Sequence, residues 1–189
     1  MDRRILKTKD AIKSNYKMLL LENKNSKITI TQLAQRANID RKTFYLHYNS
    51  VDDIMKELVE ENLSDLEFVL KENGISNDNL DAKIIIDSMN YCLVKDIEFF
   101  KAIVHRHDFQ IYINEIKKTI ISIAIRDFTE NTTNSQKEVF IYSKFIISGI
   151  VDVYVDWFLH PNNMSLDELG DIISKVLNSG IQVLSYKEL

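Results

Sequence analysis

The chain has 189 residues, of which 45% are hydrophobic and 28% charged, a balance typical of a globular protein with a buried core. One proline and four glycines leave few interruptions, which favours helices over short strands and turns. No uncharged apolar run approaches the roughly 18 to 20 residues that span a bilayer, so we expect no membrane protein.

The charge is divided unevenly along the chain, whose formal net charge is −4. Residues 1–50 contain 11 Lys and Arg against 4 Asp and Glu, net +7, whereas residues 51–189 contain 13 against 24, net −11. A basic segment can neutralise phosphates and release counterions, while an acidic remainder discourages nonspecific contact with a duplex. The division favours DNA as a partner of the first fifty residues.

The first helix should follow a short basic arm. Residues 1–7 carry three cations and no capping signal, so we expect a mobile arm or a frayed first helical turn, which either touches phosphates or has no role. Thr8 can cap a helix that runs to about residue 23. Its apolar stripe consists of Ile12, Tyr16, Leu19 and Leu20, and its opposite side carries Lys9, Lys13 and Lys17.

Residues 29–48 are expected to form two short helices joined by a tight turn. Thr29 can cap the first helix as part of a capping box, and the small Ala34 lets a second helix cross closely. In the turn, Asn38 tolerates a positive φ and Asp40 is a strong cap for the second helix. This pattern predicts a helix-turn-helix.

The second of these helices, over residues 41–48, is too short to be stable alone. Phe44 and Tyr48, at i and i+4, can hold it by packing. Two cations, two hydroxyls and one apolar side chain should point outward, a set suited to phosphates, base edges and thymine methyls: Arg41, Lys42, Thr43, Tyr45 and Leu46. The alternative is a solvated surface helix, but the capped turn favours a DNA-reading helix.

A long helix should follow over about residues 51–73, opened by a box of Ser50 and Asp53. Gly74 and the polar residues after it mark a boundary between a domain of residues 1–50 and one of residues 75–189, with the long helix as connector.

The second domain should consist of helices. We expect them over residues 80–94, 97–105, 109–128, 136–159, and from 166 toward 180. Residues 109–128 are rich in β-branched side chains, so a strand is the alternative there, but the spacing of three and four favours a helix. Boxes of Ser135 with Glu138 and Ser165 with Glu168 should open the last two helices.

The last two helices should form an interface between two copies of the chain. Residues 141–159 are apolar around most of a helix, more than one core can easily bury. Under two-fold symmetry, two such helices per copy make a self-complementary four-helix contact. The expected interface residues are Phe145, Ser148, Gly149, Val153, Ile172 and Val176. The alternative is a central helix that lies wholly inside one copy.

No pattern suggests catalysis, since there is no glycine-rich phosphate loop, nucleophile elbow or His-Glu-x-x-His, and we expect neither an enzyme nor a cofactor. His105 and His107 are two apart and face different ways on a helix, so we expect no metal. The lone Cys92 cannot form an internal disulfide, and no signal peptide is recognisable, which favours a cytoplasmic protein.

Aromatic and polar side chains of the second domain are candidates for a small-molecule pocket, although ordinary core packing is the more common role of each. The candidates are Tyr91, Cys92, Phe99, Phe100, His105, Tyr112, Tyr154 and Trp157.

The segment ITQLAQRANIDRKTFYLHYNSVDDI resembles the DNA-binding signature of the TetR family of transcriptional regulators. The Leu-Ala lead-in, the TFYxHY core and the Ser-x-x-Asp start of the next helix match in spacing, over about residues 8–60. The segment FIISGIVDVYVDWFLHPNNMSLDELGDII resembles the C-terminal half of one TetR subgroup. Two positions differ: the usual turn glycine is Asn38, and a lysine that touches a phosphate is Val51, so we expect that contact to be lost.

The resemblance implies an all-α protein with an N-terminal three-helix helix-turn-helix domain and a C-terminal helical domain that binds a ligand and forms a homodimer. It implies phosphate or packing roles for Thr29, Thr31, Tyr45, His47 and Tyr48. The candidate DNA-binding residues are therefore Thr29, Thr31 and His47 together with the outward Arg41, Lys42, Thr43, Tyr45 and Leu46. The expected function is repression at a pseudo-palindromic operator, relieved by an effector. The alternatives are control by a protein partner, activation, or a helical interaction protein that no longer reads DNA.

Overall fold

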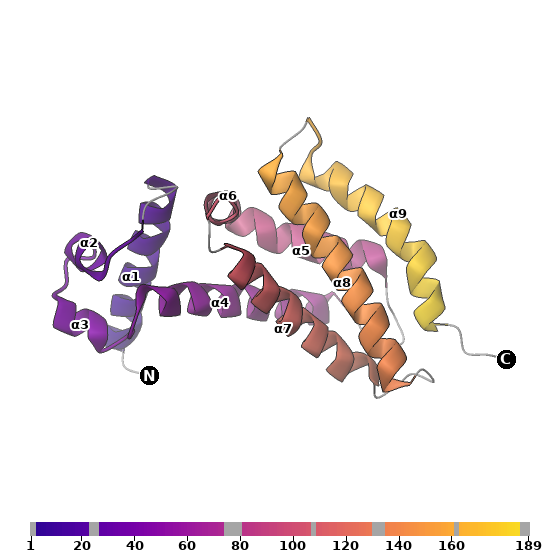
Figure 1. Ribbon diagram of the computed structural model, residues 1–189, viewed down its shortest axis with the longest axis horizontal. Helices are drawn as coiled ribbons and strands as arrows, with labels where there is room; N and C mark the ends of the chain where they lie inside the picture. The colour runs from indigo at the N-terminus through magenta and orange to yellow at the C-terminus, as the bar shows by residue number, and fades with distance from the viewer. Residues whose placement is uncertain are drawn as a thin grey trace. The chain divides into compact units, whose positions relative to one another are not determined.

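A computed structural model describes residues 3–22, 27–73, 81–106, 109–129, 135–160 and 163–185. Every regular element in these ranges is a helix (Figure 1): α1 (Arg3–Glu22), α2 (Ile30–Arg36), α3 (Arg41–Tyr45), α4 (Val51–Glu72), α5 (Ala82–Lys95), α6 (Ile97–Ile103), α7 (Phe109–Thr129), α8 (Gln136–Leu159) and α9 (Leu166–Ser185). The expected all-α class is confirmed. Within the described ranges, no helix is long and apolar enough to cross a membrane.

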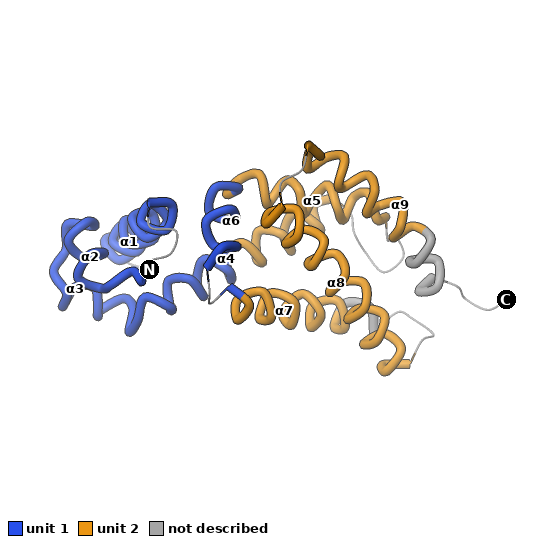
Figure 2. The backbone as a smooth tube through the Cα atoms, turned by 45° about the horizontal axis from the view of Figure 1, so that its top comes forward, with its two compact units in different colours: residues 1–61, 97–109 blue, residues 62–96, 110–189 orange. Residues whose placement is uncertain are grey.

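Backbone contacts divide the chain into two compact units (Figure 2). Unit 1 contains residues 1–61 and 97–109, and unit 2 contains residues 62–96 and 110–189. Helix α6 therefore groups with unit 1, although it follows the predicted domain boundary. Gly74 and the polar linker after it lie outside the described residues, and the division into domains of residues 1–50 and 75–189 stays a prediction.

Helix α1 begins earlier than predicted. Of the two alternatives expected for residues 1–7, the mobile arm is wrong for residues 3–7, which form the first turns of the helix, whereas Met1 and Asp2 lie outside the described residues. Thr8 does not cap the helix, because its hydroxyl donates to the carbonyl oxygen of Arg4, one turn back, at 3.0 Å. The predicted apolar stripe is buried as expected: Ile12, Tyr16, Leu19 and Leu20.

Four predicted capping boxes are confirmed, because a side-chain oxygen and a backbone amide exchange hydrogen bonds across each helix start: Thr29 with Gln32, Ser50 with Asp53, Ser135 with Glu138 and Ser165 with Glu168. Residues 109–129 form a helix despite their β-branched side chains. The last helix continues to Ser185, past the end that glycine at position 180 predicted. Pro161, the predicted terminator of α8, lies outside the described residues.

The core of unit 2 gathers side chains from α5, α8 and α9 around one buried amide. The apolar members are Ala82, Ile86, Ile150, Tyr154, Leu166, Leu169, Ile173 and Leu177. The hydroxyl of Tyr154 donates to Oδ1 of Asn90 at 2.5 Å, and Nδ2 of Asn90 donates to the carbonyl oxygen of Leu166 at 3.1 Å. The amide thus joins three helices and has partners for both of its polar ends.

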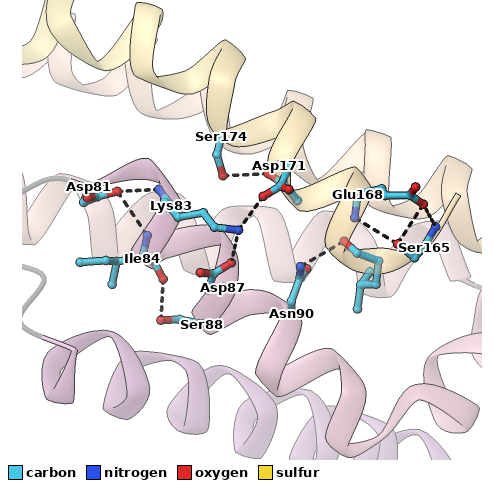
Figure 3. Close-up of polar contacts among 12 residues, drawn as sticks. Asp81, Lys83, Ile84, Asp87, Ser88, Asn90, Ser165, Glu168, Asp171 and Ser174 are labelled. Carbon is cyan, nitrogen blue, oxygen red and sulfur yellow. Dashed lines mark hydrogen bonds and ion pairs between the residues drawn. The ribbon is translucent and has the colours of Figure 1, made fainter.

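At the exposed edge of this packing, a lysine joins α5 to α9 (Figure 3). The ammonium of Lys83 lies 2.9 Å from Asp87 on its own helix and 2.7 Å from Asp171 on α9. The hydrogen bond to Asp171, followed by the one to Asp87, raises the pKa of Lys83. Because all three groups are exposed, these ion pairs contribute little to stability.

Gly170 lets α9 approach α5 at the buried amide, so Gly170→Ala should be destabilising. A Cβ at this position would lie 2.7 Å from Nδ2 of Asn90 and 3.0 Å from Cγ2 of Ile86. The two hydrogen bonds of the Asn90 amide prevent it from moving aside. We expect the free energy of unfolding, measured by urea denaturation, to fall by about 1–3 kcal/mol.

The matched control for this change is the same substitution in an Asn90→Ala background. Removing the amide removes the clash, so Gly170→Ala should then cost much less, a non-additivity that a double-mutant cycle measures. Equal costs in both backgrounds would contradict the close approach of Gly170 to Asn90.

Candidate nucleic-acid interface

The helix-turn-helix is built from local hydrogen bonds that the sequence specifies. The hydroxyl of Thr29 accepts from the amide of Gln32 at 3.2 Å, and the side chain of Gln32 accepts from the amide of Thr29 at 2.9 Å. Among the described non-glycine residues, Asn38 alone has a positive φ, of 53°, at the predicted turn. The turn closes where the amide of Ile39 donates to the carbonyl oxygen of Ala34 at 3.0 Å.

Asp40 caps the start of α3. Its carboxylate accepts from the backbone amide of Thr43 at 2.6 Å, as predicted for a cap. This hydrogen bond from the Thr43 amide is the main reason why the pKa of Asp40 lies below its ordinary value. The carboxylate therefore stays ionised at the start of α3, where the exposed backbone amides favour a negative charge.

Phe44 and Tyr48 hold α3 from the inside. Phe44 is 0% exposed and Tyr48 is 4% exposed, and their ring centroids lie 5.9 Å apart. Helix α3 ends at Tyr45, earlier than predicted, but the amide of Tyr48 still donates to the carbonyl oxygen of Phe44 at 3.0 Å. Of the two roles considered for Tyr48, its burial favours packing over a contact with a phosphate.

The outward face of α3 presents four of the five side chains predicted to point outward, with Thr43 the exception. Arg41 and Lys42 are exposed, as are Tyr45 and Leu46, the latter at 75%. Thr29 and Thr31 are also exposed, while Thr43 and His47 are half-buried. Two cations thus lie beside an exposed aromatic and an exposed aliphatic side chain, an arrangement able to meet phosphates and the apolar parts of base edges.

Several other cations of unit 1 have partners within the unit. Arg36 forms a two-point ion pair with Glu22, with one contact at 2.6 Å, and its hydrogen bond is the main cause of the lowered pKa of Glu22. Lys17 lies over the ring of Phe99, with Nζ 5.2 Å from the ring centroid. The predicted cationic side of α1 is therefore partly wrong, because Lys9 and Lys13 also pair with carboxylates of α4.

The candidate pocket residues divide between the two units, with Phe99, Phe100 and His105 in unit 1 and the other five in unit 2. Their individual surroundings favour packing. Trp157 donates from Nε1 to the carbonyl oxygen of Met164 at 2.9 Å, and burial raises the pKa of the Cys92 thiol. Tyr112 is buried, whereas Tyr91 is exposed. The pocket stays a prediction.

The candidate dimer residues form an exposed apolar stripe on α8 and α9. On α8, Ile141, Phe145, Gly149 and Val153 follow one another at intervals of four, which places them on one helical face. Phe145 is 81% exposed, and a Cβ added at Gly149 would meet no atom within 4 Å. Ile172 and Val176 of α9 are also exposed, while Ser148 is half-buried.

The interior of unit 2 contains partners that sequence reasoning missed. Asn90 and Gly170 were not selected, because an asparagine and a glycine within helical segments carry no signal of contact. In unit 1, Lys9 and Lys13 repeat at i and i+4, as do Glu57 and Glu61, so each pair shares one face of its own helix, but the repeat does not show that the two faces meet.

Comparisons with known proteins agree with this architecture. A TetR family model, described as "Transcriptional regulator C-terminal region", matches residues 78–179. A curated relative, the uncharacterized HTH-type transcriptional regulator YxbF of Bacillus subtilis (strain 168), is 27% identical over 67 residues, which are 35% of this chain. The match spans only 18% of that relative's length.

Two solved structures share the fold over nearly the whole chain. A TetR transcriptional regulator from Streptococcus agalactiae 2603V is 22% identical, with a TM-score of 0.62 over 93% of this chain and 96% of that one. The dihydroxyacetone kinase operon activator DhaS is 17% identical, with a TM-score of 0.62 over 95% and 98%. Since the family model covers more than half of the chain, this chain belongs to the TetR family of transcriptional regulators.

Proposed function

We propose that this chain binds a pseudo-palindromic operator as a homodimer and represses transcription until an effector binds its C-terminal domain. The observation that carries the proposal is the outward face of α3, where exposed Arg41, Lys42, Tyr45 and Leu46 follow a turn held by the left-handed Asn38. In the proposed division, residues 1–50 read DNA and residues 75–189 dimerise and sense the signal.

The exposed stripe on α8 and α9 supports the homodimer. Monomeric proteins rarely leave such a continuous apolar stripe in water, and an isologous contact would cover it on both copies. Two copies would present their α3 helices to successive major grooves when these helices lie roughly 34–36 Å apart, one turn of the duplex. An effector that favours another separation by 1–3 kcal/mol would weaken operator binding about 5- to 150-fold.

Activation is the second candidate function. DhaS, whose structure has the same fold, is described as an operon activator. A reporter gene behind the selected operator, measured with and without the protein, separates the two directions of control.

Lys42→Ala should weaken DNA binding and flatten its dependence on salt. The side chain is exposed beside the other outward residues of α3, so it can reach a phosphate. The probe is the duplex that the wild-type protein selects from a random-sequence library. Removing one phosphate contact should reduce the slope of log K against log[salt] by about 0.9, measured by fluorescence anisotropy.

The matched control is Lys118→Ala, which removes an exposed lysine of α7 in unit 2. This variant should bind the selected duplex with the affinity and the slope of the wild type. If Lys42→Ala also leaves both quantities unchanged, Lys42 does not contact DNA.

A further inference from the structure

Four charged side chains join α1 to the first turns of α4, and we name Lys9, Lys13, Glu57 and Glu61 the α1–α4 clamp. The ammonium of Lys9 lies 2.6 Å from Oε2 of Glu57. The ammonium of Lys13 lies 3.4 Å from Oε1 of the same carboxylate and also forms a closer ion pair with Glu61. Glu57 therefore accepts two cations, one on each carboxylate oxygen.

The clamp is partly withdrawn from water, which distinguishes it from ordinary surface pairs. The side chain of Lys13 is only 14% exposed, and that of Glu57 is 23% exposed. Burial opposes ionisation of both groups, yet the pKa of Lys13 is raised by its bond to Glu61, and the pKa of Glu57 is lowered by Lys9. Each charge is thus held by its partners, and solvent screens these pairs less than exposed ones.

Lys9 connects the clamp to the recognition helix. Its Nζ lies 5.1 Å from the centroid of the Tyr48 ring, within the range of a cation–π contact. The backbone amide of Tyr48 donates a hydrogen bond to the carbonyl oxygen of Phe44, whose buried side chain anchors α3. One ammonium therefore touches both the first turns of α4 and the segment that closes α3.

We propose that Glu57 is a positioning residue for DNA reading, which acts by holding Lys9 against Tyr48 and so sets the orientation of α3 on α1 and α4. The inference rests on the proposed DNA-binding function. It also means that Lys9 and Lys13, although they belong to the basic segment, neutralise carboxylates of α4 and make no contact with phosphates. Sequence-specific binding then depends on an acidic residue that never touches DNA.

The direction in which Glu57→Gln changes the affinity for the selected duplex separates a positioning role from a purely electrostatic one. Glu57→Gln removes a negative charge from the DNA-binding unit, so long-range electrostatics alone would tighten binding to any duplex. A positioning role predicts the opposite for the selected duplex, because the recognition helix loses its orientation. Affinity for a scrambled duplex, which depends on charge and not on the fit to bases, should stay the same or rise.

The experiment measures both affinities by fluorescence anisotropy for the full-length wild type, Glu57→Gln and Glu60→Gln. Glu60 is an exposed residue of the same helix outside the clamp, so its variant carries the same change in charge. We expect Glu57→Gln to bind the selected duplex roughly tenfold more weakly, and Glu60→Gln to bind it at least as tightly as the wild type. Circular dichroism at the assay temperature should show the same helix content in all three, which rules out unfolding as the cause.

Two further variants extend the test, and Lys13→Gln keeps the proposal falsifiable even if Glu57→Gln folds poorly. In a double-mutant cycle with Lys9→Met, the two substitutions should be non-additive, because either one breaks the same link. Lys13→Gln should leave the salt slope unchanged, whereas a phosphate contact would lower it by about 0.9.

The proposal is overturned if Glu57→Gln binds the selected duplex as tightly as Glu60→Gln does, if the cycle is additive, or if Lys13→Gln lowers the slope. A wild-type protein that selects no duplex would be a different failure. It would remove the proposed function, and the role of the clamp in reading DNA would fall with it.

Discussion

Phe44→Ala is expected to lower the free energy of unfolding of unit 1 by about 3–5 kcal/mol and to abolish binding to the selected duplex. Phe44 is 0% exposed, and its ring lies 5.8 Å from that of Tyr45 and 5.9 Å from that of Tyr48, measured between centroids. Helix α3 has only five residues and cannot persist without this anchor. Urea denaturation followed by circular dichroism measures the stability, and fluorescence anisotropy measures the binding.

Leu46→Ala is the matched control, since it also shortens an apolar side chain in the same turn. Leu46 is 75% exposed, so its loss should change the free energy of unfolding by no more than about 0.5 kcal/mol. Binding to the selected duplex should nevertheless weaken, because Leu46 is expected to face the groove. A Phe44→Ala protein as stable as Leu46→Ala would contradict the role of Phe44 as the anchor of α3.

The parts of the fold that sequence reasoning predicted well depend on local signals. In a capping box, a serine or threonine and a carboxylate or glutamine three residues later each accept a hydrogen bond from the other's backbone amide. Because both partners are close in sequence, the starts of α2, α4, α8 and α9 could be predicted without tertiary information. The same holds for Asn38, whose short polar side chain tolerates a positive φ. The outward face of α3 could be predicted in the same way, because Asp40 marks where the helix begins and the helical repeat then gives the residues that point outward.

The parts that could not be predicted depend on partners far away in the sequence. Threonine is a common N-cap residue, but the hydroxyl of Thr8 instead donates to the carbonyl oxygen of Arg4, one turn earlier. The first turns of α1 form without Thr8 as a cap. The lysines of α1 looked solvent-facing because helical periodicity does not reveal that α4 brings Glu57 opposite them. A net charge of +7 for the first fifty residues therefore overstates the cations free to meet phosphates.

The ligand pocket illustrates the same limit more strongly. Aromatic side chains are suited equally to a core and to a pocket, and only tertiary placement separates the two roles. Tyr154 was a pocket candidate, yet its hydroxyl donates to the side-chain amide oxygen of Asn90. Burial is the main reason why the pKa of this hydroxyl is raised. Likewise, the single side-chain donor of Trp157, its Nε1–H, bonds the carbonyl oxygen of Met164. Residues that already have internal partners are less available to an effector.

Phe145→Glu should convert the proposed dimer into a folded monomer and weaken binding to the selected duplex by two orders of magnitude or more. Phe145 is 81% exposed in the single chain, so a charged residue there costs the monomer little. In an isologous contact the substitution occurs twice, and both carboxylates would be buried without a partner. Analytical ultracentrifugation at micromolar concentration measures the association state, and thermal unfolding followed by circular dichroism confirms the fold.

The weakening of DNA binding follows from the loss of the link between two half-sites. While two recognition helices are joined, binding of the first holds the second near its half-site at an effective concentration that raises the overall affinity about 10²- to 10⁴-fold. A monomer loses this gain although its α3 is unaltered. Ile111→Glu, which places the same charge at an exposed apolar position of α7, should remain dimeric and keep its affinity, since Ile111 lies outside the stripe. If Phe145→Glu stays dimeric, the stripe on α8 and α9 does not form the interface.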